Sequence, residues 1–259
     1  MEEYLEFAIG IAKYAGSVMK DYFYKDKNVE FKEDRTPVTI VDKTINKYLI
    51  DEVKKKYPTH KVIGEEECFN NDSKCAWVCD PLDGTSMFTR GIPVSVFSLA
   101  YVEDGEPLVG VVYDPFLDEM YTAIKGKGAY LNGKEIHVNN KDFGQLGASV
   151  DYCMWNKALY DTLEIVKEIR KDVKTCCIGS VAHACMLVAN GTLAGEIFPG
   201  SSHGECDIAA SKLIVEEAGG KTGDFFGNSQ RYDQDINGFI ATNGVIHDEL
   251  IRRLERTYK

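Results

Sequence analysis

The sequence has 259 residues, with 41 acidic and 30 basic side chains and a formal net charge of −11. This charge argues against binding to nucleic acid or to an anionic membrane surface, because both need clustered Lys and Arg side chains. The N-terminus has no basic segment followed by an apolar core, and no apolar run approaches the length of a membrane span, so we expect a cytoplasmic protein.

The eight cysteines are interpreted as reduced, because several lie in apolar segments of a chain without an export signal. Cys75 and Cys79 supply half of a structural zinc site by spacing, but no second pair of Cys or His residues completes it. The sequence contains no repeat, low-complexity tract or linker. We therefore predict a single domain, with an N-terminal part at about residues 1–145, a C-terminal part at about residues 146–259, and the site between them.

An amphipathic helix is predicted over residues 3–24, where apolar residues recur at helical spacing. The polar stretch at residues 25–35 predicts a solvated loop or hairpin, from which Lys32 or Arg35 is in a position to reach an anion.

A second helix is predicted after a turn at residues 36–42, and Pro58 ends it. Thr39 is its candidate N-cap. Asp42 lies in the first turn, where the helix dipole favours a carboxylate. Asp42 is therefore either a helix-start residue with no further role or part of a functional site, and the local sequence leaves both interpretations open.

The most informative segment of the chain is residues 77–85, Trp-Val-Cys-Asp-Pro-Leu-Asp-Gly-Thr. It is predicted to be an apolar strand that breaks at Pro81. Pro81 fixes φ and Gly84 permits a reversal, so that Asp80 and Asp83 can converge. A capped turn with two solvated acids is the ordinary interpretation of such a segment. Convergent carboxylates would instead suit a hard cation, Mg²⁺ before Ca²⁺ or Mn²⁺.

A short strand is predicted at residues 61–64, directly before three acidic residues. If this strand is the parallel neighbour of the strand that ends at Asp80, both deliver carboxylates to one edge of a sheet, where open sheets place ligands. Glu65 then joins Asp80 and Asp83.

The middle third of the chain predicts antiparallel sheet that frames the site. Strand-like runs at residues 94–102, 107–113, 120–124 and 129–131 are separated by turns that contain glycine.

A helix near residues 158–171, a buried strand at 173–178 and a second apolar helix up to Gly191 follow. The Gly179-Ser180 pair at the start of that helix offers backbone N–H groups to a ligand. His183 lies between two alanines inside the helix, and we interpret it as a core histidine with satisfied hydrogen bonds in preference to a catalytic one.

Glu196 lies on a predicted strand at residues 193–198 and is placed to meet a substrate hydroxyl. The irregular loop after it contains His203. Asp207 opens a helix that runs to about residue 219, a position at which most proteins use Asp as an N-cap. A strand and a polar amphipathic helix close the chain.

In combination and in this order, these motifs resemble the inositol monophosphatase family of Mg²⁺-dependent, lithium-sensitive sugar phosphatases. The motifs are Gly-Glu-Glu at 64–66, Asp-Pro-Leu-Asp-Gly-Thr at 80–85 and Asp-Ile-Ala-Ala at 207–210, with further matches at 37–42, 110–113, 126–133 and 217–220. The resemblance covers nearly the whole chain. It implies an α/β sandwich layered αβαβα, with mixed, largely antiparallel sheets, and a homodimer.

The resemblance also implies the metal ligands. According to the family pattern, one Mg²⁺ is bound by Glu65, Asp80 and the backbone carbonyl of Leu82. Asp80, Asp83 and Asp207 bind a second Mg²⁺, and Glu65 helps to hold a third ion through water. Two to three Mg²⁺ ions per site are thus expected, with Mn²⁺ as a possible substitute and with inhibition by Li⁺.

The catalytic residues implied by the resemblance are Asp42, Thr85 and Glu65, of which Asp42 and Thr85 orient and deprotonate the attacking water. Gly84 and Thr85 provide backbone donors to the phosphate. The full substrate-binding set implied in this way is Asp83, Gly84, Thr85, Gly179, Ser180, Glu196 and Asp207. The chemistry agrees with this assignment, because hydrolysis of a phosphate monoester needs positive charge beside the phosphate and a water of lowered pKa.

Three departures from the family pattern concern Asn46, where the family often has an acid, Cys206, where it often has Trp, and the loop at 199–205, which is longer than in plain inositol phosphatases. Residues 198–207 resemble the branch that hydrolyses 3′-phosphoadenosine 5′-phosphate, and residues 88–93 resemble the histidinol-phosphate branch. Inositol 1-phosphate is the first expected substrate, and fructose 1,6-bisphosphate, histidinol phosphate and the adenosine bisphosphate are the alternatives. A metal-binding regulatory protein without turnover is the alternative from another class.

Overall fold

Two large β-sheets, a separate two-stranded sheet and seven helices are found in the part of the chain that the computed structural model describes, residues 1–32, 35–69, 72–145, 148–153, 158–201 and 203–258. The helices are α1 (Glu2–Tyr22), α2 (Ile40–Lys56), α3 (Thr85–Thr89), α4 (Leu163–Ile169), α5 (Val181–Ala189), α6 (Gly204–Glu217) and α7 (His247–Tyr258). The strands are β1 (Glu30–Phe31), β2 (Pro37–Val38), β3 (Lys61–Gly64), β4 (Cys75–Asp83), β5 (Val96–Glu103), β6 (Glu106–Asp114), β7 (Glu119–Ile124), β8 (Ala129–Leu131), β9 (Lys134–Ile136), β10 (Ser149–Tyr152), β11 (Lys174–Cys176), β12 (Gly195–Phe198), β13 (Lys221–Gly223) and β14 (Phe239–Thr242).

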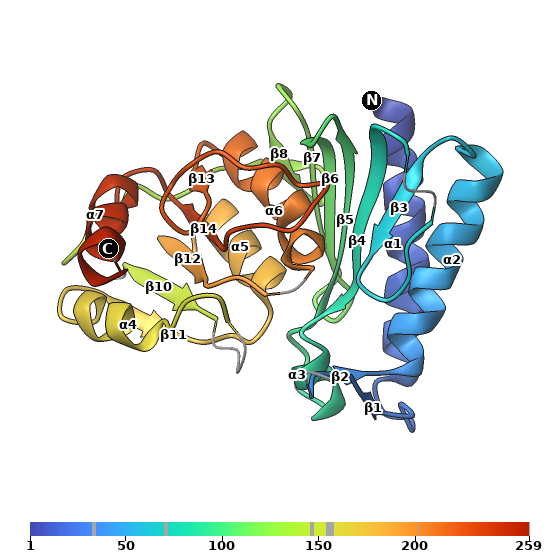
Figure 1. The fold of residues 1–259 in the computed structure, drawn as a ribbon, viewed down its shortest axis with the longest axis horizontal. Helices are drawn as coiled ribbons and strands as arrows, with labels where there is room; N and C mark the ends of the chain where they lie inside the picture. Colours follow the sequence, from blue (N-terminus) through green and yellow to red (C-terminus); the bar gives the residue numbers. More distant parts are fainter. Residues whose placement is uncertain (33–34, 70–71, 146–147, 154–157, 202, 259) are drawn as a thin grey trace.

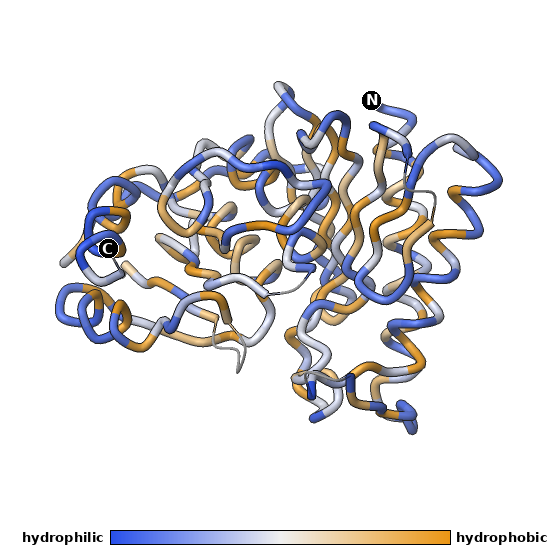
Figure 2. Tube along the Cα trace, in the orientation of Figure 1, coloured by the Kyte–Doolittle hydropathy of each residue, from blue (hydrophilic) through white to orange (hydrophobic). Residues whose placement is uncertain are grey.

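Helical layers and sheets alternate across the molecule (Figure 1). α1 and α2 cover one face of a sheet formed by β3 to β9, and α5 and α6 lie between this sheet and a second one, formed by β10 to β14. α4 and α7 cover the far face of the second sheet. Figure 2 shows hydrophobic residues concentrated on the strands, whereas hydrophobic and hydrophilic residues alternate along the outer helices. This order of layers confirms the predicted αβαβα fold class.

α1 packs flat on the larger sheet, as its apolar stripe predicts. Its buried side includes Ala8, Ala12 and Ala15, whose small side chains let the helix approach the strands closely. At Gly16 the approach is closest, since a Cβ atom there would lie 2.3 Å from the ring of Tyr113 on β6. The helix predicted over residues 3–24 is therefore confirmed.

The larger sheet has the order β3-β4-β5-β6-β7-β8-β9 among the described residues. β3 runs parallel to β4, and the remaining neighbours are antiparallel. Asp104 and Gly105 connect β5 to β6 with φ values of 51° and 85°, the two left-handed residues of a tight hairpin turn. Both the parallel pair that was expected to bring Glu65 beside Asp80 and the antiparallel middle third are confirmed.

The smaller sheet has the order β11-β10-β12-β14-β13 within the described chain, with β10 parallel to both of its neighbours. Here two predictions are corrected. The buried strand predicted at 173–178 is the short edge strand β11, whose residues are exposed or half-buried because an edge strand has only one neighbour. The helix predicted near 158–171 is limited to α4, and residues 154–157 before it lie outside the described residues.

The stretch at residues 25–35, predicted as a loop or hairpin, contains the first strand of the antiparallel pair β1 and β2. Residues 33 and 34 lie outside the described residues. All eight cysteines are free, as predicted. No described helix combines the length and apolar character that a membrane crossing requires.

Candidate active site

Three carboxylates converge where β4 ends and α6 begins. Asp80 and Asp83 lie on β4, and the register of its pairing with β5 shifts between them, so the strand continues through the predicted break at Pro81 as an irregularity. Asp207 lies in the first turn of α6. One carboxylate oxygen of each residue lies within 4.8 Å of those of the other two. Asp80 and Asp207 are 127 positions apart in the sequence, and the fold brings their carboxylates together.

This cluster is electrostatically unfavourable without a cation. Asp80 and Asp83 are almost fully buried. Burial, followed by the charges of Glu65 and Asp207, raises the pKa of Asp80 well above its usual range. Burial, followed by Asp83 and Glu65, does the same to the pKa of Asp207. Three oxygen ligands that repel one another in this way fit a hard divalent cation, which would offset their charge.

Asp83 is fixed by donors from the start of α5. The Ser180 hydroxyl and the Ala182 backbone N–H both donate to its Oδ2 atom, at 2.7 and 2.6 Å. Burial raises the pKa of Asp83 to about 6, even though these donors act to lower it. Ser180 is also the N-cap of α5, because its hydroxyl accepts from the His183 N–H. The helix start therefore orients this carboxylate.

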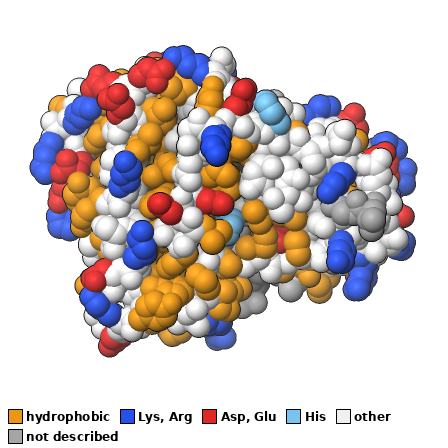
Figure 3. Space-filling model, turned by 180° about the vertical axis from the view of Figure 1, so that it is seen from behind, with side chains coloured by type: hydrophobic (Ala, Val, Ile, Leu, Met, Phe, Trp, Pro, Cys, Tyr) orange, Lys and Arg blue, Asp and Glu red, His pale blue; other side chains and the backbone are white. Residues whose placement is uncertain are grey.

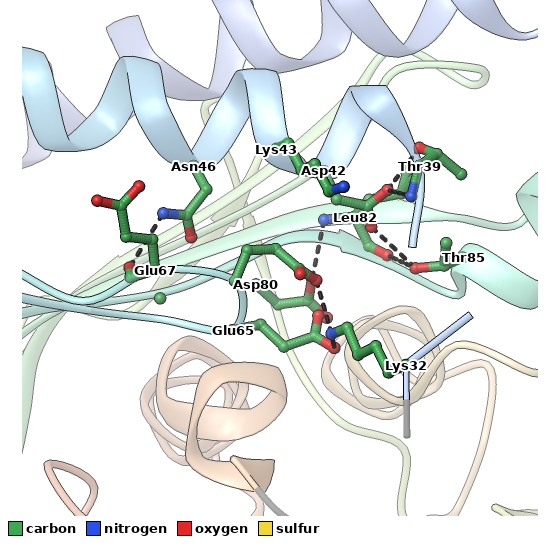
Figure 4. Close-up of polar contacts among 12 residues, drawn as sticks. Lys32, Thr39, Asp42, Lys43, Asn46, Glu65, Glu67, Asp80, Leu82 and Thr85 are labelled. Atoms are coloured by element: carbon green, nitrogen blue, oxygen red, sulfur yellow. Dashed lines mark hydrogen bonds and ion pairs between the residues drawn. The ribbon is translucent and has the colours of Figure 1, made fainter. Parts of the chain in front are cut away.

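Asp42 is joined to Thr85 by a hydrogen bond (Figure 4). The backbone N–H and the hydroxyl of Thr39 donate to Asp42 Oδ2 at 2.8 and 2.5 Å, which completes the capping box of α2. The Thr85 hydroxyl lies 3.1 Å from Asp42 Oδ1 and 2.9 Å from the carbonyl oxygen of Leu82. Burial raises the pKa of Asp42 to about 7, against the effect of the Thr39 donors. Asp42 thus completes the helix start and also accepts a hydrogen bond from Thr85, directly after β4.

Glu65 follows β3 and faces the same site, but its nearest partner is a lysine (Figure 4). The Nζ atom of Lys32, from the β1–β2 hairpin, lies 2.8 Å from Glu65 Oε1 and 2.7 Å from Glu66 Oε1. Burial lowers the pKa of Lys32, but the two carboxylates outweigh it and leave the pKa raised. An ammonium group between these acids shows that a cation is favoured at this position.

Two glycines allow the walls of the site to meet. Gly84 has a φ of 86°, and a Cβ atom there would lie 3.1 Å from both the Gly179 carbonyl oxygen and the Ser180 Cβ. Gly179 has a φ of 88°, and its Cβ atom would lie 2.4 Å from the side chain of Met87. Both positions therefore need glycine.

The acids surround a cavity of about 580 Å³, a volume within the range of small-molecule sites. Of the predicted site residues, those that line it are Glu65, Asp80, Leu82, Asp83, Gly84, Thr85, Gly179 and Asp207. Asp42 and Ser180 are buried behind this lining, bonded to Thr85 and Asp83 respectively. Cys153, Cys177, Ser201 and His203 also line it, although none of them was predicted as a site residue.

The structure does not bring Glu196 to the cavity. Its side chain is fully buried on β12, opposite Asp151 on β10, and it is not among the described residues that line the cavity. Burial and then the Asp151 carboxyl raise the pKa of Glu196 well above its usual range. Sequence reasoning missed Asp151, since the strand β10 that carries it was not predicted.

Two of the three departures from the family pattern, Asn46 and Cys206, have structural partners. The Asn46 side chain donates from Nδ2 to the Glu67 carbonyl oxygen at 3.0 Å, and so tethers the acidic run after β3 to α2. The Cys206 thiol is buried 3.6 Å from the Ile63 carbonyl oxygen. Both residues therefore support the segment that carries Glu65.

Known proteins resemble the chain over its full length. The model of the inositol monophosphatase family matches residues 1–258. Inositol monophosphatase 2 of Solanum lycopersicum is 36% identical over 267 residues, which cover 99% of this chain and 100% of that protein. A fructose-1,6-bisphosphatase/inositol-1-monophosphatase of Thermotoga maritima is 33% identical, with 96% and 94% covered. The solved structure of a Thermotoga maritima IMPase has a TM-score of 0.86 at 30% identity, with 98% and 97% covered.

Proposed function

The chain belongs to the inositol monophosphatase family and is a phosphoric monoester hydrolase, and we propose that its principal substrate is inositol 1-phosphate. The observation that carries the proposal is the convergence of Asp80, Asp83 and Asp207 on a cavity that Thr85 and Glu65 also line. A related protein bears both fructose-1,6-bisphosphatase and inositol-1-monophosphatase in its name. Fructose 1,6-bisphosphate is therefore the second candidate.

The metals in this proposal are two to three Mg²⁺ ions, with Mn²⁺ as a substitute. Glu65, Asp80 and the Leu82 carbonyl would hold one, and Asp80, Asp83 and Asp207 a second, with Glu65 near a third. When bound, the ions lower the pKa of water and neutralise charge on the phosphate. The repulsion among the clustered carboxylates supports this assignment.

In the proposed reaction, Thr85 and Asp42 move one proton away from the attacking water. The Thr85 hydroxyl accepts a hydrogen bond from that water and donates its own proton to Asp42 Oδ1, the atom 3.1 Å away. The pKa of about 7 at Asp42 suits a base that works near neutral pH. The Leu82 carbonyl oxygen, 2.9 Å from the same hydroxyl, is the alternative acceptor for its single proton; a metal ion bound to that carbonyl would leave the hydroxyl to donate to Asp42.

Substrate binding is proposed to use the two walls of the cavity. The backbone N–H groups of Gly84 and Thr85 donate to the phosphate, and Lys32 and Arg35, which line the cavity, add positive charge beside it. Gly179 lies on the opposite wall, toward the organic part of the substrate, and Ser180, predicted together with it, is buried behind that wall and holds Asp83 in place. We keep Glu196 as a proposed contact only for a state in which β12 becomes accessible, since it is fully buried.

The test is a phosphate-release assay with Mg²⁺ on four esters: inositol 1-phosphate, fructose 1,6-bisphosphate, histidinol phosphate and 3′-phosphoadenosine 5′-phosphate. We expect the highest kcat/KM with inositol 1-phosphate. A higher value with another ester reassigns the substrate. Failure to release phosphate from any of the four would instead favour a metal-binding regulatory protein without turnover.

Four further properties are part of the proposal. They are a cytoplasmic location, a homodimer, inhibition by Li⁺, and a division near residue 145 with the cavity between the two parts. We propose a small phosphorylated substrate and a second copy of the chain as the partners. The net charge of −11 agrees with the expectation that neither nucleic acid nor a membrane is a partner. On the face drawn in Figure 3, Lys and Arg side chains are scattered singly. Light scattering during gel filtration tests the dimer.

A further inference from the structure

We propose that His203, Glu205 and Asp235 form a second metal site that binds a borderline divalent ion such as Zn²⁺, separate from the cluster of Asp80, Asp83 and Asp207. One ligand atom of each residue lies within 4.8 Å of those of the other two. The His203 Nδ1 atom is 3.8 Å from Glu205 Oε1. This separation is too long for a hydrogen bond and leaves room for an ion bound to both atoms.

The three residues come from two segments that the fold brings together. His203 directly precedes α6 with a left-handed φ of 58°, and Glu205 is in the first turn of that helix. Asp235 lies in the loop between β13 and β14. Spacing along the chain could not reveal this set, because 30 positions separate residues 205 and 235.

A buried carboxylate oxygen gives independent evidence for a ligand. Glu205 is only 2% exposed, and its Oε2 atom is buried with no hydrogen-bond partner. Leaving such a group without a donor or a cation is costly, and native proteins rarely do so. His203 and Asp235 are exposed, so water has access to the other side of the cluster. A cation bound by Glu205 and these two side chains would satisfy the orphaned oxygen.

The donor set indicates the class of metal. Imidazole nitrogen favours Zn²⁺ and similar transition ions, whereas Mg²⁺ and Ca²⁺ prefer sites made of oxygen alone. Two carboxylates balance the charge of a divalent ion. Three protein ligands leave a fourth position for water, as in open zinc sites.

The helix geometry keeps this site apart from the acid cluster. Glu205 and Asp207 are two residues apart on α6, and side chains at that spacing do not share a helix face. Asp207 therefore joins β4, and Glu205 turns toward the loop that carries Asp235. His203 nevertheless lines the large cavity, so a metal here would fix part of the cavity wall. It lies in the loop at 199–205 that sets this chain apart from plain inositol phosphatases; Ser202 is outside the described residues.

The test measures Zn²⁺ binding to the full chain by equilibrium dialysis and elemental analysis, in excess Mg²⁺ so that the acid cluster is occupied. We expect one Zn²⁺ per chain. His203→Gln and Asp235→Asn should each weaken it at least about 100-fold, since loss even of an outer-shell partner costs roughly 10–100-fold. Both side chains are exposed, so neither change should prevent folding.

His137→Gln is the matched control. His137 Nε2 lies 3.9 Å from Glu135 Oε1, almost the same distance as in the proposed site, but this pair is exposed and belongs to no group of three described ligands. Zn²⁺ binding should persist in this variant and in Asp80→Asn. Absorption bands of bound Co²⁺ provide a second readout that does not depend on turnover. Equal Zn²⁺ binding by wild type, His203→Gln and Asp235→Asn would overturn the proposal.

Discussion

The two walls of the cavity are built in different ways. On one side, Asp80, Asp83 and Thr85 lie at the end of β4 and directly after it, on a sheet whose two faces are covered by helices. On the other side, Ser180 and Asp207 lie at helix starts, and Cys177 and His203 lie in irregular segments. The first wall holds its side chains on a buried, rigid element, whereas the second combines helix starts with exposed connections.

This difference suggests a division of function between the two walls. Groups that act on the phosphate must be held within a fraction of an ångström, which buried strands do better than loops. Groups that select the organic part of a substrate can differ among relatives, and loops tolerate such changes. Asp207 and Ser180 are the exceptions, because α6 and α5 carry them to the phosphate side from the second half of the chain. The following substitutions test the division, beginning with the largest expected effect.

The largest loss is expected for Asp83→Asn. This change removes a carboxylate from the acid cluster but keeps a side chain that can accept from Ser180 and Ala182. We expect kcat/KM to fall by at least roughly 1,000-fold, about 4 kcal/mol of transition-state stabilisation. Asp104→Asn, in the β5–β6 turn where Asn is equally suitable, is the control and should retain full activity. A loss below tenfold in Asp83→Asn would remove the metal assignment.

A smaller loss on the same wall is expected for Thr85→Ala. Without its hydroxyl, the path from the attacking water to Asp42 Oδ1 is broken. Removal of a positioned acid–base group costs about 10²–10⁴-fold, so we expect kcat to fall in this range while KM changes little. Thr85→Ser keeps the hydroxyl and should recover most of the rate. If Thr85→Ala and Thr85→Ser were equally active, Thr85 would have only a structural role.

The buried acids Asp42 and Asp83 also predict how metal-free protein responds to pH. The pKa values of Asp42 and Asp83 are raised in the fold to about 7 and about 6, above the ordinary 3.8. The folded state therefore binds more protons than the unfolded state between about pH 4 and pH 7, and stability falls as pH rises through this window. Between pH 5 and pH 7.5 we expect the Tm of chelator-treated protein to drop by roughly 5 °C or more.

Saturating Mg²⁺ should reverse this drop at pH 7.5, because an ion that binds only the folded state stabilises it by mass action. Asp80→Asn, with one acid fewer in the cluster, should show a shallower dependence on pH. Thermal unfolding followed by circular dichroism measures all three samples. A Tm for metal-free wild type that rises steadily from pH 5 to pH 7.5 would contradict the proposed repulsion.

The sequence was most informative where motif and structure are local. The helix cap at Thr39, the strand 61–64, its parallel neighbour and the β5–β6 hairpin could all be predicted, because each depends on residues that are close in the chain or follow a clear hydrophobic pattern. The approach of Asp207 to Asp80 followed from family resemblance, since no local signal connects positions so far apart.

Most of what sequence reasoning missed lies in the second half of the chain. β10 and its Asp151 gave no distinct strand signal, and β11 was expected to be buried because its apolar flanks do not reveal that it has a neighbour on one side only. The burial of Glu196 depends on the order of strands in the smaller sheet, which a single sequence does not encode locally. The ion pair of Lys32 with Glu65 joins two segments whose charges appeared solvated when each was considered alone.

The smallest effect is expected on the second wall, for Cys177→Ser. Cys177 is exposed, lines the cavity, and lies two residues before Gly179 in the chain. If this wall selects the organic part of the substrate, the substitution should change the ratio of the kcat/KM values for inositol 1-phosphate and fructose 1,6-bisphosphate by roughly threefold to tenfold. The kcat for each substrate should stay within about twofold of the wild-type value. Cys68→Ser, at an exposed cysteine that is not among the described cavity residues, should leave the ratio unchanged. A fall in kcat with an unchanged ratio would instead place Cys177 with the chemistry, and the division between the two walls would fail.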